Sequence, residues 1–266
     1  MGKVDRLTLI AMAVIAYALA NVAHEAVGHG GMCVAVGGKP IALNAVYFDC
    51  DEDGLTAAAS KWIAAGGTLV DLLLAALSFA ALRVLPRRPT TARYAAWLFF
   101  SVNAMQAAGY WLFSGVGNLG DWAKVVEGLG TSGRVGLGVL GGLAYLVVIR
   151  LSLAELLLFA GPSEGRVGRA RALTLLPYLV GGALYCAAGA LNPESPMLVL
   201  VSAGAASFGG TSAFAWMYNL LHGKRWSETT EPPFALARSV PWIAFAAVLA
   251  SVFIFVLGRT VYLRPP

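Results

Sequence analysis

The chain has 266 residues, of which 58% are hydrophobic and 12% are charged, and its formal net charge is +5. A soluble domain of this length cannot bury so much apolar surface, so the composition argues against a soluble protein and indicates an integral membrane protein. The three cysteines, Cys33, Cys50 and Cys186, have no paired spacing, which suggests neither a disulfide framework nor a thiolate metal cluster.

Apolar runs are the main structural signal along the chain. A membrane-spanning helix needs about 20 largely apolar residues, and about seven segments meet this requirement. They are residues 7–29, 62–85, 94–116, 135–160, 172–190, 197–221 and 235–258. The first has the charged start of a signal peptide, but no clear small-residue cleavage site follows, so we expect a retained helix. The sequence therefore predicts an all-α, multi-pass protein embedded in a lipid bilayer.

Basic and acidic connections alternate between these runs. The basic ones are 86–93, 161–171 and 222–225, and the acidic ones are 48–54, 117–128 and 192–196. Because Lys and Arg favour the cytoplasmic side of a membrane, we expect a cytoplasmic N-terminus and outward acidic loops. The compact chain favours a bacterial cell membrane.

The outward end of the first run carries the sequence HEAVGH, residues 24–29. His24 and His29 are five residues apart. In a regular α-helix, residues four apart lie about 40° from each other around the axis, whereas residues five apart lie about 140° from each other. A metal site on both histidines therefore requires a π-type turn, or a helix that loosens near Gly28. Single π-turns are rare but concentrate at functional sites.

The motif places ionisable side chains inside an apolar run, and the free-energy cost of burying them must be offset by some interaction. His24, Glu25 and His29 are three ionisable residues in an otherwise apolar run, and each is costly to place in hydrocarbon. A metal ion bound by the histidines, with Glu25 as general base, is the simplest interaction that would offset this cost. The alternative is that these are polar residues packed at a helix interface.

The next segment, 37–60, is too polar to span a membrane. Its stretch IALNAVYF predicts a short β-rich element near the membrane surface.

Three parts of the chain resemble the site-2 protease class of intramembrane zinc metalloproteases. The sequence HEAVGHGGMCVAVGGKPIALN resembles the H-E-x-x-H helix of that class, which runs into small residues and a β-rich segment. GGTLVDLLLA at 66–75 is similar to the A-G-P-L-A-N-L-L-L stretch, with Asp71 at the Asn position. A third helix with Asn103, followed by GNLGDW at 117–122, resembles the region that supplies an Asp as third zinc ligand.

The resemblance covers roughly residues 10–125. It implies a metalloprotease-like core of three transmembrane helices at 1–131, with additional helices of the same membrane domain at 132–266. The motif here is H-E-x-x-G-H, a form that binds zinc in the soluble dipeptidyl peptidase III family, although that similarity is confined to six residues. The interval from Asn103 to Asp121 is longer than in typical site-2 proteases.

These residues predict a specific chemistry. We expect His24, His29 and Asp121 to hold Zn²⁺, with a fourth position left for water. Glu25 would act as general base, and Asn103 would bind the substrate. Asp71 is an alternative third ligand. The predicted activity is zinc-dependent hydrolysis of peptide bonds in transmembrane or juxtamembrane substrates.

Other functions remain open on the sequence alone. The same zinc chemistry would hydrolyse a lipid amide, and a non-enzymatic metal-binding membrane protein or transporter would also carry intramembrane His, Asp and Glu. The stretch GLGTSG at 128–133 matches a bare G-x-G-x-x-G pattern, but no strand precedes it, so we do not expect a nucleotide site. We expect no nucleic-acid partner.

Overall fold

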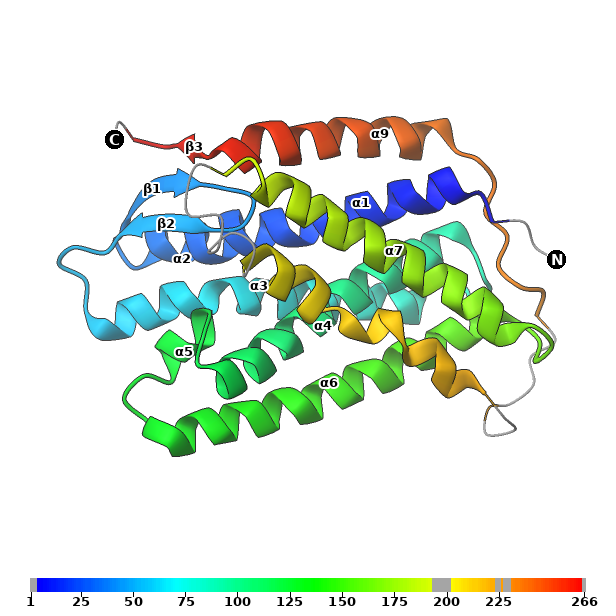
Figure 1. Ribbon diagram of the computed structural model, residues 1–266, viewed down its shortest axis with the longest axis horizontal. Helices are drawn as coiled ribbons and strands as arrows, with labels where there is room; N and C mark the ends of the chain where they lie inside the picture. Colours follow the sequence, from blue (N-terminus) through cyan, green and yellow to red (C-terminus); the bar gives the residue numbers. More distant parts are fainter. Residues whose placement is uncertain (1–3, 193–201, 223–225, 227–230, 265–266) are drawn as a thin grey trace.

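The computed structural model describes residues 4–192, 202–222, 226 and 231–264. Long helices run side by side along one direction, and a small sheet covers one end of them (Figure 1). The first helix is continuous from α1 through a π-helix, η1, into α2. The helical elements are α1 (Arg6–Val22), η1 (Ala23–His29), α2 (Gly30–Ala35), α3 (Ala57–Val84), α4 (Thr91–Gly117), α5 (Asp121–Val125), α6 (Gly130–Ala160), α7 (Arg166–Gly189), η2 (Ala205–Gly209), η3 (Ser212–Ala215), η4 (Met217–Leu221), α9 (Val240–Ser251), η5 (Val252–Val256) and η6 (Leu257–Arg259).

Several of these helices begin at a residue that the sequence marks as an N-cap. The side chain of Asp5 accepts a hydrogen bond from the Thr8 backbone N–H at the start of α1. Thr56 and Thr90 cap α3 and α4 in the same way. Such side chains satisfy a backbone donor that has no partner within the helix, which explains why the helices begin where they do.

Five helices in the described part of the chain are long and apolar enough to cross a membrane: Arg6–Ala35, Ala57–Val84, Gly130–Ala160, Arg166–Gly189 and Val240–Arg259. Exposed apolar side chains, such as Leu143 and Leu146 on α6 and Val248 and Phe255 in the last helix, face outward as lipid contact requires. The structure is therefore mostly helical and compatible with the multi-pass membrane architecture predicted from composition.

The expected count of about seven spans is not confirmed. The segment 94–116 does form a long helix, α4, but α4 carries buried polar residues such as Ser101, Asn103 and Gln106 and is not among the five. The segment 197–221 begins in residues outside the described part of the chain, and from Ala205 onward it is divided into the short turns η2, η3 and η4. Hydropathy counts apolar residues, but it does not report whether backbone hydrogen bonding continues without interruption.

The helix α4 occupies the middle of the bundle and packs against both α3 and α6. Close approach of α4 and α6 depends on glycine, because a Cβ at Gly115 would lie 2.3 Å from the backbone nitrogen of Gly138. A Cβ at Gly141 would lie 2.2 Å from the nitrogen of Leu112. Small residues at such contacts are how helices associate closely without a hydrophobic driving force between them.

The β-rich segment predicted after the first helix is a hairpin of β1 (Lys39–Leu43) and β2 (Phe48–Asp51). A third strand, β3 (Val261–Tyr262), pairs antiparallel with β1, so the strand order is β2-β1-β3. The sequence did not indicate β3. Its pairing brings the end of the last helix to the hairpin, at the same end of the molecule as α2 (Figure 1).

A disulfide corrects the interpretation of the cysteines. Cys33 in α2 is bonded to Cys50 in β2, with a Cα–Cα distance of 6.2 Å. The sequence analysis suggested no disulfide because 17 residues separate the two positions in no recognised pattern. The hairpin folds back over α2 and creates the proximity, which is a tertiary effect.

Candidate metal centre

The motif HEAVGH forms the π-helix η1, which confirms the distortion that its spacing requires. Hydrogen bonds between residues five apart define a π-turn, so His24 and His29 lie on the same side of the helix. Their Nε2 atoms are 3.2 Å apart. A local change of helix type therefore brings together two side chains that a regular α-helix would point apart.

Glycines let α3 approach this π-helix. A Cβ at Gly28 would lie 2.5 Å from the Cα of Gly67, and a Cβ at Gly67 would lie 2.4 Å from Nε2 of His24. A helix loosened near Gly28 was the alternative to a π-turn, but the backbone at Gly28 stays helical and α3 packs directly on it. Close packing of α3 fixes the position of the His24 ring.

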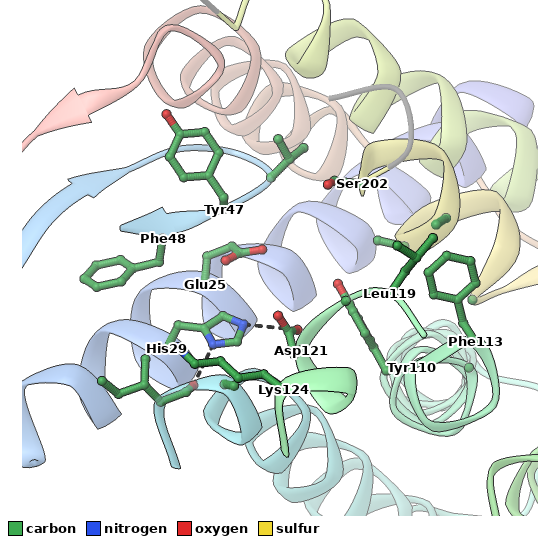
Figure 2. Close-up of a pocket in the computed structure, with 18 of the residues that line it drawn as sticks. Glu25, His29, Tyr47, Phe48, Tyr110, Phe113, Leu119, Asp121, Lys124 and Ser202 are labelled. Carbon is green, nitrogen blue, oxygen red and sulfur yellow. Dashed lines mark hydrogen bonds and ion pairs between the residues drawn. The ribbon is translucent and has the colours of Figure 1, made fainter. Parts of the chain in front are cut away.

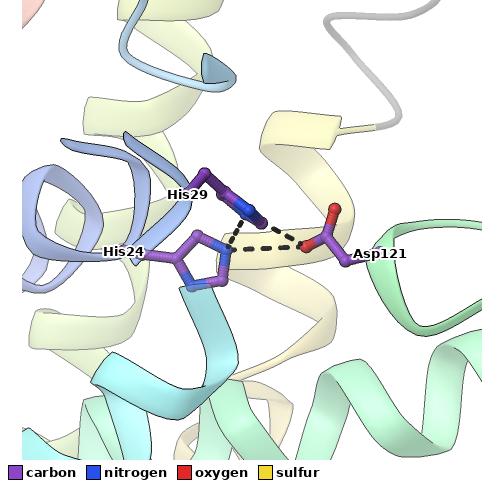
Figure 3. A group of neighbouring side chains, drawn as sticks. All are labelled: His24, His29 and Asp121. Carbon is purple, nitrogen blue, oxygen red and sulfur yellow. Dashed lines mark hydrogen bonds and ion pairs between the residues drawn. The ribbon is translucent and has the colours of Figure 1, made fainter. Parts of the chain in front are cut away.

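Asp121 completes the group from a different element. It is the first residue of α5, after a turn in which Asn118 and Gly120 adopt positive φ values of 54° and 77°. Its Oδ2 lies 3.4 Å from Nε2 of His29 and 3.6 Å from Nε2 of His24. Figure 3 shows the two rings and the carboxylate converging on one point. These three residues form a group that can hold a metal ion.

The hydrogen bonds of the two rings determine which nitrogen carries the proton. Nδ1 of His29 donates to the backbone oxygen of Ile63, and Nδ1 of His24 donates to Oδ2 of Asp71, each at 2.8 Å. A carbonyl oxygen and a carboxylate only accept, so in neutral imidazoles the Nε2 atoms carry lone pairs. Two lone pairs and the Asp121 carboxylate therefore face one another, an arrangement that a cation stabilises.

The spacing of the three atoms suits zinc. With zinc–nitrogen and zinc–oxygen bonds of about 2.0–2.1 Å, neighbouring ligand atoms of a tetrahedral site lie about 3.3 Å apart. The observed separations of 3.2, 3.4 and 3.6 Å are close to this value. Two histidines and one carboxylate leave a fourth position free for water. The residues present therefore fit the ion that the sequence motif implies.

Electrostatics favour the ionised form of Asp121. Burial raises the pKa of this carboxyl, but when the two imidazoles are protonated, the charge of His29 and the hydrogen bonds from His24 and His29 lower it by more, so its net pKa lies below the usual range. The carboxyl is therefore deprotonated at neutral pH, as a metal ligand must be.

Asp71, the alternative third ligand, lies behind His24 and not beside the other ligand atoms. Its side chain is fully buried, and its Oδ2 holds the ring nitrogen that faces away from His29. A carboxylate in this position orients a metal-binding imidazole and raises its basicity. Asp121 is therefore the carboxylate in the group that can hold a metal ion, and Asp71 accepts a hydrogen bond from the opposite side of the His24 ring.

A cavity of about 430 Å³ opens beside the three residues. Glu25 and His29 line it from η1, while Tyr110 and Asp121 line it from α4 and α5. Figure 2 shows the Glu25 carboxylate directed into this space, next to His29 and Asp121. Much of the remaining wall is apolar and comes from the β1–β2 hairpin, from α4 and the loop after it, and from η2, including Val46, Phe48, Phe113, Leu119, Ala205 and Ala206.

Asn103, the expected substrate-binding residue, is not among the residues lining the cavity. It is fully buried, and its Nδ2 donates to the backbone oxygen of Phe99, one turn earlier in α4. Tyr110 lies seven residues further along the helix, about 10 Å closer to the metal ligands. Asn103 therefore lies on a helix that borders the cavity, but about two turns before the residue that lines it.

Tyr110 is the site residue that the sequence analysis missed. Its ring stacks on His24, with centroids 4.9 Å apart and an interplanar angle of 18°. Its hydroxyl points into the cavity beside Asp121 (Figure 2). The available signal was the spacing of Asn103, Gln106 and Tyr110, which places three polar side chains along one face of an apolar helix.

Two lysines fix the segment that carries Asp121. Nζ of Lys124 lies 2.9 Å from both carboxylate oxygens of Glu52, and Nζ of Lys61 donates to the backbone oxygen of Glu127. These contacts connect α5 to the hairpin and to α3. The third member of the metal-binding group is thereby held over the first two, although it lies 92 residues beyond His29 in the chain.

Comparisons of the chain with family models, with curated proteins and with solved structures give no match. The case for a function therefore depends on the geometry of this site and on the short motifs in the sequence.

Proposed function

We propose that this protein is an intramembrane zinc metalloprotease that hydrolyses peptide bonds of transmembrane or juxtamembrane substrates. One observation carries the proposal. Two imidazole Nε2 atoms and an ionised carboxylate converge at the spacing of zinc ligands, beside a buried glutamate that faces a cavity. Burial of so many ionisable groups in an apolar chain costs free energy, and such groups are found together mainly at functional sites, which supports a catalytic role.

The roles of the side chains follow from their positions. His24, His29 and Asp121 would hold the ion, which when bound supplies an activated water and polarises the scissile carbonyl. The carboxylate of Glu25 accepts the proton of the attacking water and then delivers it to the nitrogen of the leaving amine. The hydroxyl of Tyr110 donates a hydrogen bond to the carbonyl oxygen as negative charge develops on it.

The depth of the site supports a substrate at the membrane boundary. His24 lies 18 residues after Arg6, about 27 Å along the helix, and the hydrocarbon core is about 30 Å thick. The motif would then lie near the far surface, where water can enter the cavity. A peptide leaving its own transmembrane helix at this level would reach Glu25 without crossing the membrane interior.

The disulfide supports the outward orientation of this end. Disulfides persist in oxidising compartments and are rare in the cytosol. Cys33 and Cys50 are joined close to His29, at the same end of the molecule as the acidic loops 48–54 and 117–128. This agrees with the loop charges, so we place the N-terminus in the cytoplasm and the cavity outside, in a bacterial cell membrane.

Glu25→Gln tests the proposal because it keeps the size of the side chain and removes the base. We expect purified protein to contain one zinc per chain with or without the change, and only the unchanged protein to cleave labelled transmembrane peptides. Glu127→Gln, at an exposed acid close to α5, is the matched control and should cleave normally.

Three results would contradict the assignment. Absence of stoichiometric zinc from protein with intact His24 and His29 would remove its basis. Cleavage of labelled lipid amides in place of peptides would identify a lipid amide hydrolase with the same chemistry. Zinc binding with an unaffected physiological function in the Glu25→Gln variant would identify a non-enzymatic metal-binding protein.

A further inference from the structure

A second cavity, of about 700 Å³, lies at the opposite end of the molecule. We call this the basic end, because it carries the loops 86–93 and 161–171, and the end with the hairpin and His24 the metal end. The cavity is lined by residues from the start of α1 and from the first turns of α7. Phe159 and Phe234 form its floor, and both are buried.

Three arginines border this cavity, and they differ in what they bind. Arg169 is engaged, because its Nε donates to the backbone oxygen of Ala160 and its Nη2 to that of Pro162. Arg6 and Arg171 are exposed, and within the described residues neither has a carboxylate partner. Two guanidinium groups at the cavity therefore remain available for an anion.

The nearest acid in the sequence does not neutralise this charge. Asp5 precedes Arg6, but its Oδ1 accepts from the backbone N–H and hydroxyl of Thr8. Its Oδ2 accepts from Nε of Arg238 at 3.1 Å. Both oxygens of this carboxylate therefore already accept hydrogen bonds, one at the N-cap of α1 and one from Arg238. An anion in the cavity would meet the charges of Arg6 and Arg171 without competition from Asp5.

The cavity continues from the charged groups along an apolar surface. Arg171, Leu175 and Leu179 are spaced four residues apart on α7, which places them along one face of the helix. Leu179 is 49% exposed, and Leu175 and Leu176 also line the cavity. From Arg171 to Leu179 the helix rises about 12 Å. In a membrane protein, an arginine followed by leucines along one helix face would place the cation at the lipid headgroups and the leucines beside the acyl chains.

We propose that this cavity binds an anionic phospholipid of the adjacent leaflet. The phosphate pairs with the guanidinium groups of Arg6 and Arg171, and an acyl chain lies along Leu175, Leu176 and Leu179. Inorganic phosphate would use only the charged part of the cavity, and a zwitterionic lipid would present its own cation to the arginines. The bound lipid connects the start of α1 to α7. The site is separate from the metal centre and does not depend on the proposed protease activity.

The test measures lipid retention by the full-length protein in detergent. Native mass spectrometry and thermal unfolding are followed while phosphatidylglycerol, phosphatidylcholine or inorganic phosphate is added. We expect phosphatidylglycerol alone to be retained and to raise Tm. The double variant Arg6→Gln/Arg171→Gln should bind it about 30-fold more weakly, the contribution expected of two basic residues at a membrane surface.

The control variant is Arg87→Gln/Arg88→Gln. It removes the same charge from the same end of the molecule, at exposed positions that do not line the cavity. Lipid affinity in this variant should equal that of the unchanged protein. Equal weakening by both double variants would overturn the proposal, because it would show attraction to overall charge. An equal Tm increase with inorganic phosphate, or equal retention of phosphatidylcholine, would also overturn it.

Discussion

Buried ionisable side chains are paired differently at the two ends of the molecule. At the basic end, Arg93 is almost fully buried, and its donors meet the carboxylate of Glu155 at 2.8–3.0 Å and the backbone oxygens of Leu85 and Pro86. Donors and acceptors there are matched within the chain. At the metal end, the Nε2 atoms of His24 and His29 and the carboxylate of Asp121 are all acceptors, and they face one another.

This difference separates a structural network from a binding site. A matched set such as Arg93 and Glu155 satisfies its own hydrogen bonds and leaves no place for a ligand. A set of converging acceptors is stable only when a cation joins it. Substitutions at the basic end should therefore change the free energy of unfolding, and substitutions at the metal end should change metal binding and catalysis.

Gly67→Ala should give the largest effect at the metal end. The added Cβ would lie 2.4 Å from Nε2 of His24, so the ring must move away from its position beside His29. We expect loss of stoichiometric zinc and of peptide cleavage, measured by elemental analysis and by a cleavage assay. Gly31→Ala is the matched control, because a Cβ there meets no atom within 4 Å. Full zinc content in the Gly67→Ala variant would contradict the geometry of the site.

Arg93→Met tests the basic end. It leaves the partly buried Glu155 carboxylate without its cation, and breaking a buried pair in this way costs about 3–5 kcal/mol of unfolding free energy. Tm should fall, while zinc content of the folded protein stays at one per chain. A matched Arg238→Met change, at an exposed ion pair with Asp5, should lower Tm much less, because exposed ion pairs contribute little to stability. Loss of zinc from folded Arg93→Met protein would erase the distinction between the two ends.

Tyr110→Phe removes one hydroxyl from the cavity and keeps the ring that stacks on His24. If this hydroxyl stabilises the developing oxyanion, kcat should fall about 10²-fold to 10³-fold. Zinc affinity and Tm should hardly change. Tyr178→Phe, at a hydroxyl that bonds the backbone oxygen of Phe208 away from the cavity, is the control. An unchanged kcat in the Tyr110→Phe variant would assign Tyr110 to packing alone.

Asp71→Asn should give the smallest of these effects. The amide can still accept the hydrogen bond from His24, but it lacks the charge that makes the ring a stronger ligand. Loss of such an orienting carboxylate typically weakens metal affinity about 10-fold to 100-fold. Competition with a zinc chelator measures this change. Complete loss of zinc would instead point to Asp71 as a direct ligand.

The sequence alone determined the features that depend on neighbouring residues. Apolar runs predicted the five helices that are long and apolar enough to cross a membrane, because hydrophobicity over about 20 residues is a local property. The five-residue interval between His24 and His29 predicted a π-type turn or a helix loosened near Gly28, since a regular α-helix points the two rings apart, and the structure has the π-turn. The hairpin after the first helix was indicated by its own β-forming residues.

Only the tertiary structure decided which distant residues meet. Asp71 lies behind His24, Tyr110 stacks on it, and Cys33 is bonded to Cys50 because separate elements pack together. The residues that neighbour each of them in the sequence do not indicate which distant residue it contacts. Close packing of α3 on the π-helix, at Gly28 and Gly67, fixes side-chain positions that the spacing of residues in the sequence does not determine.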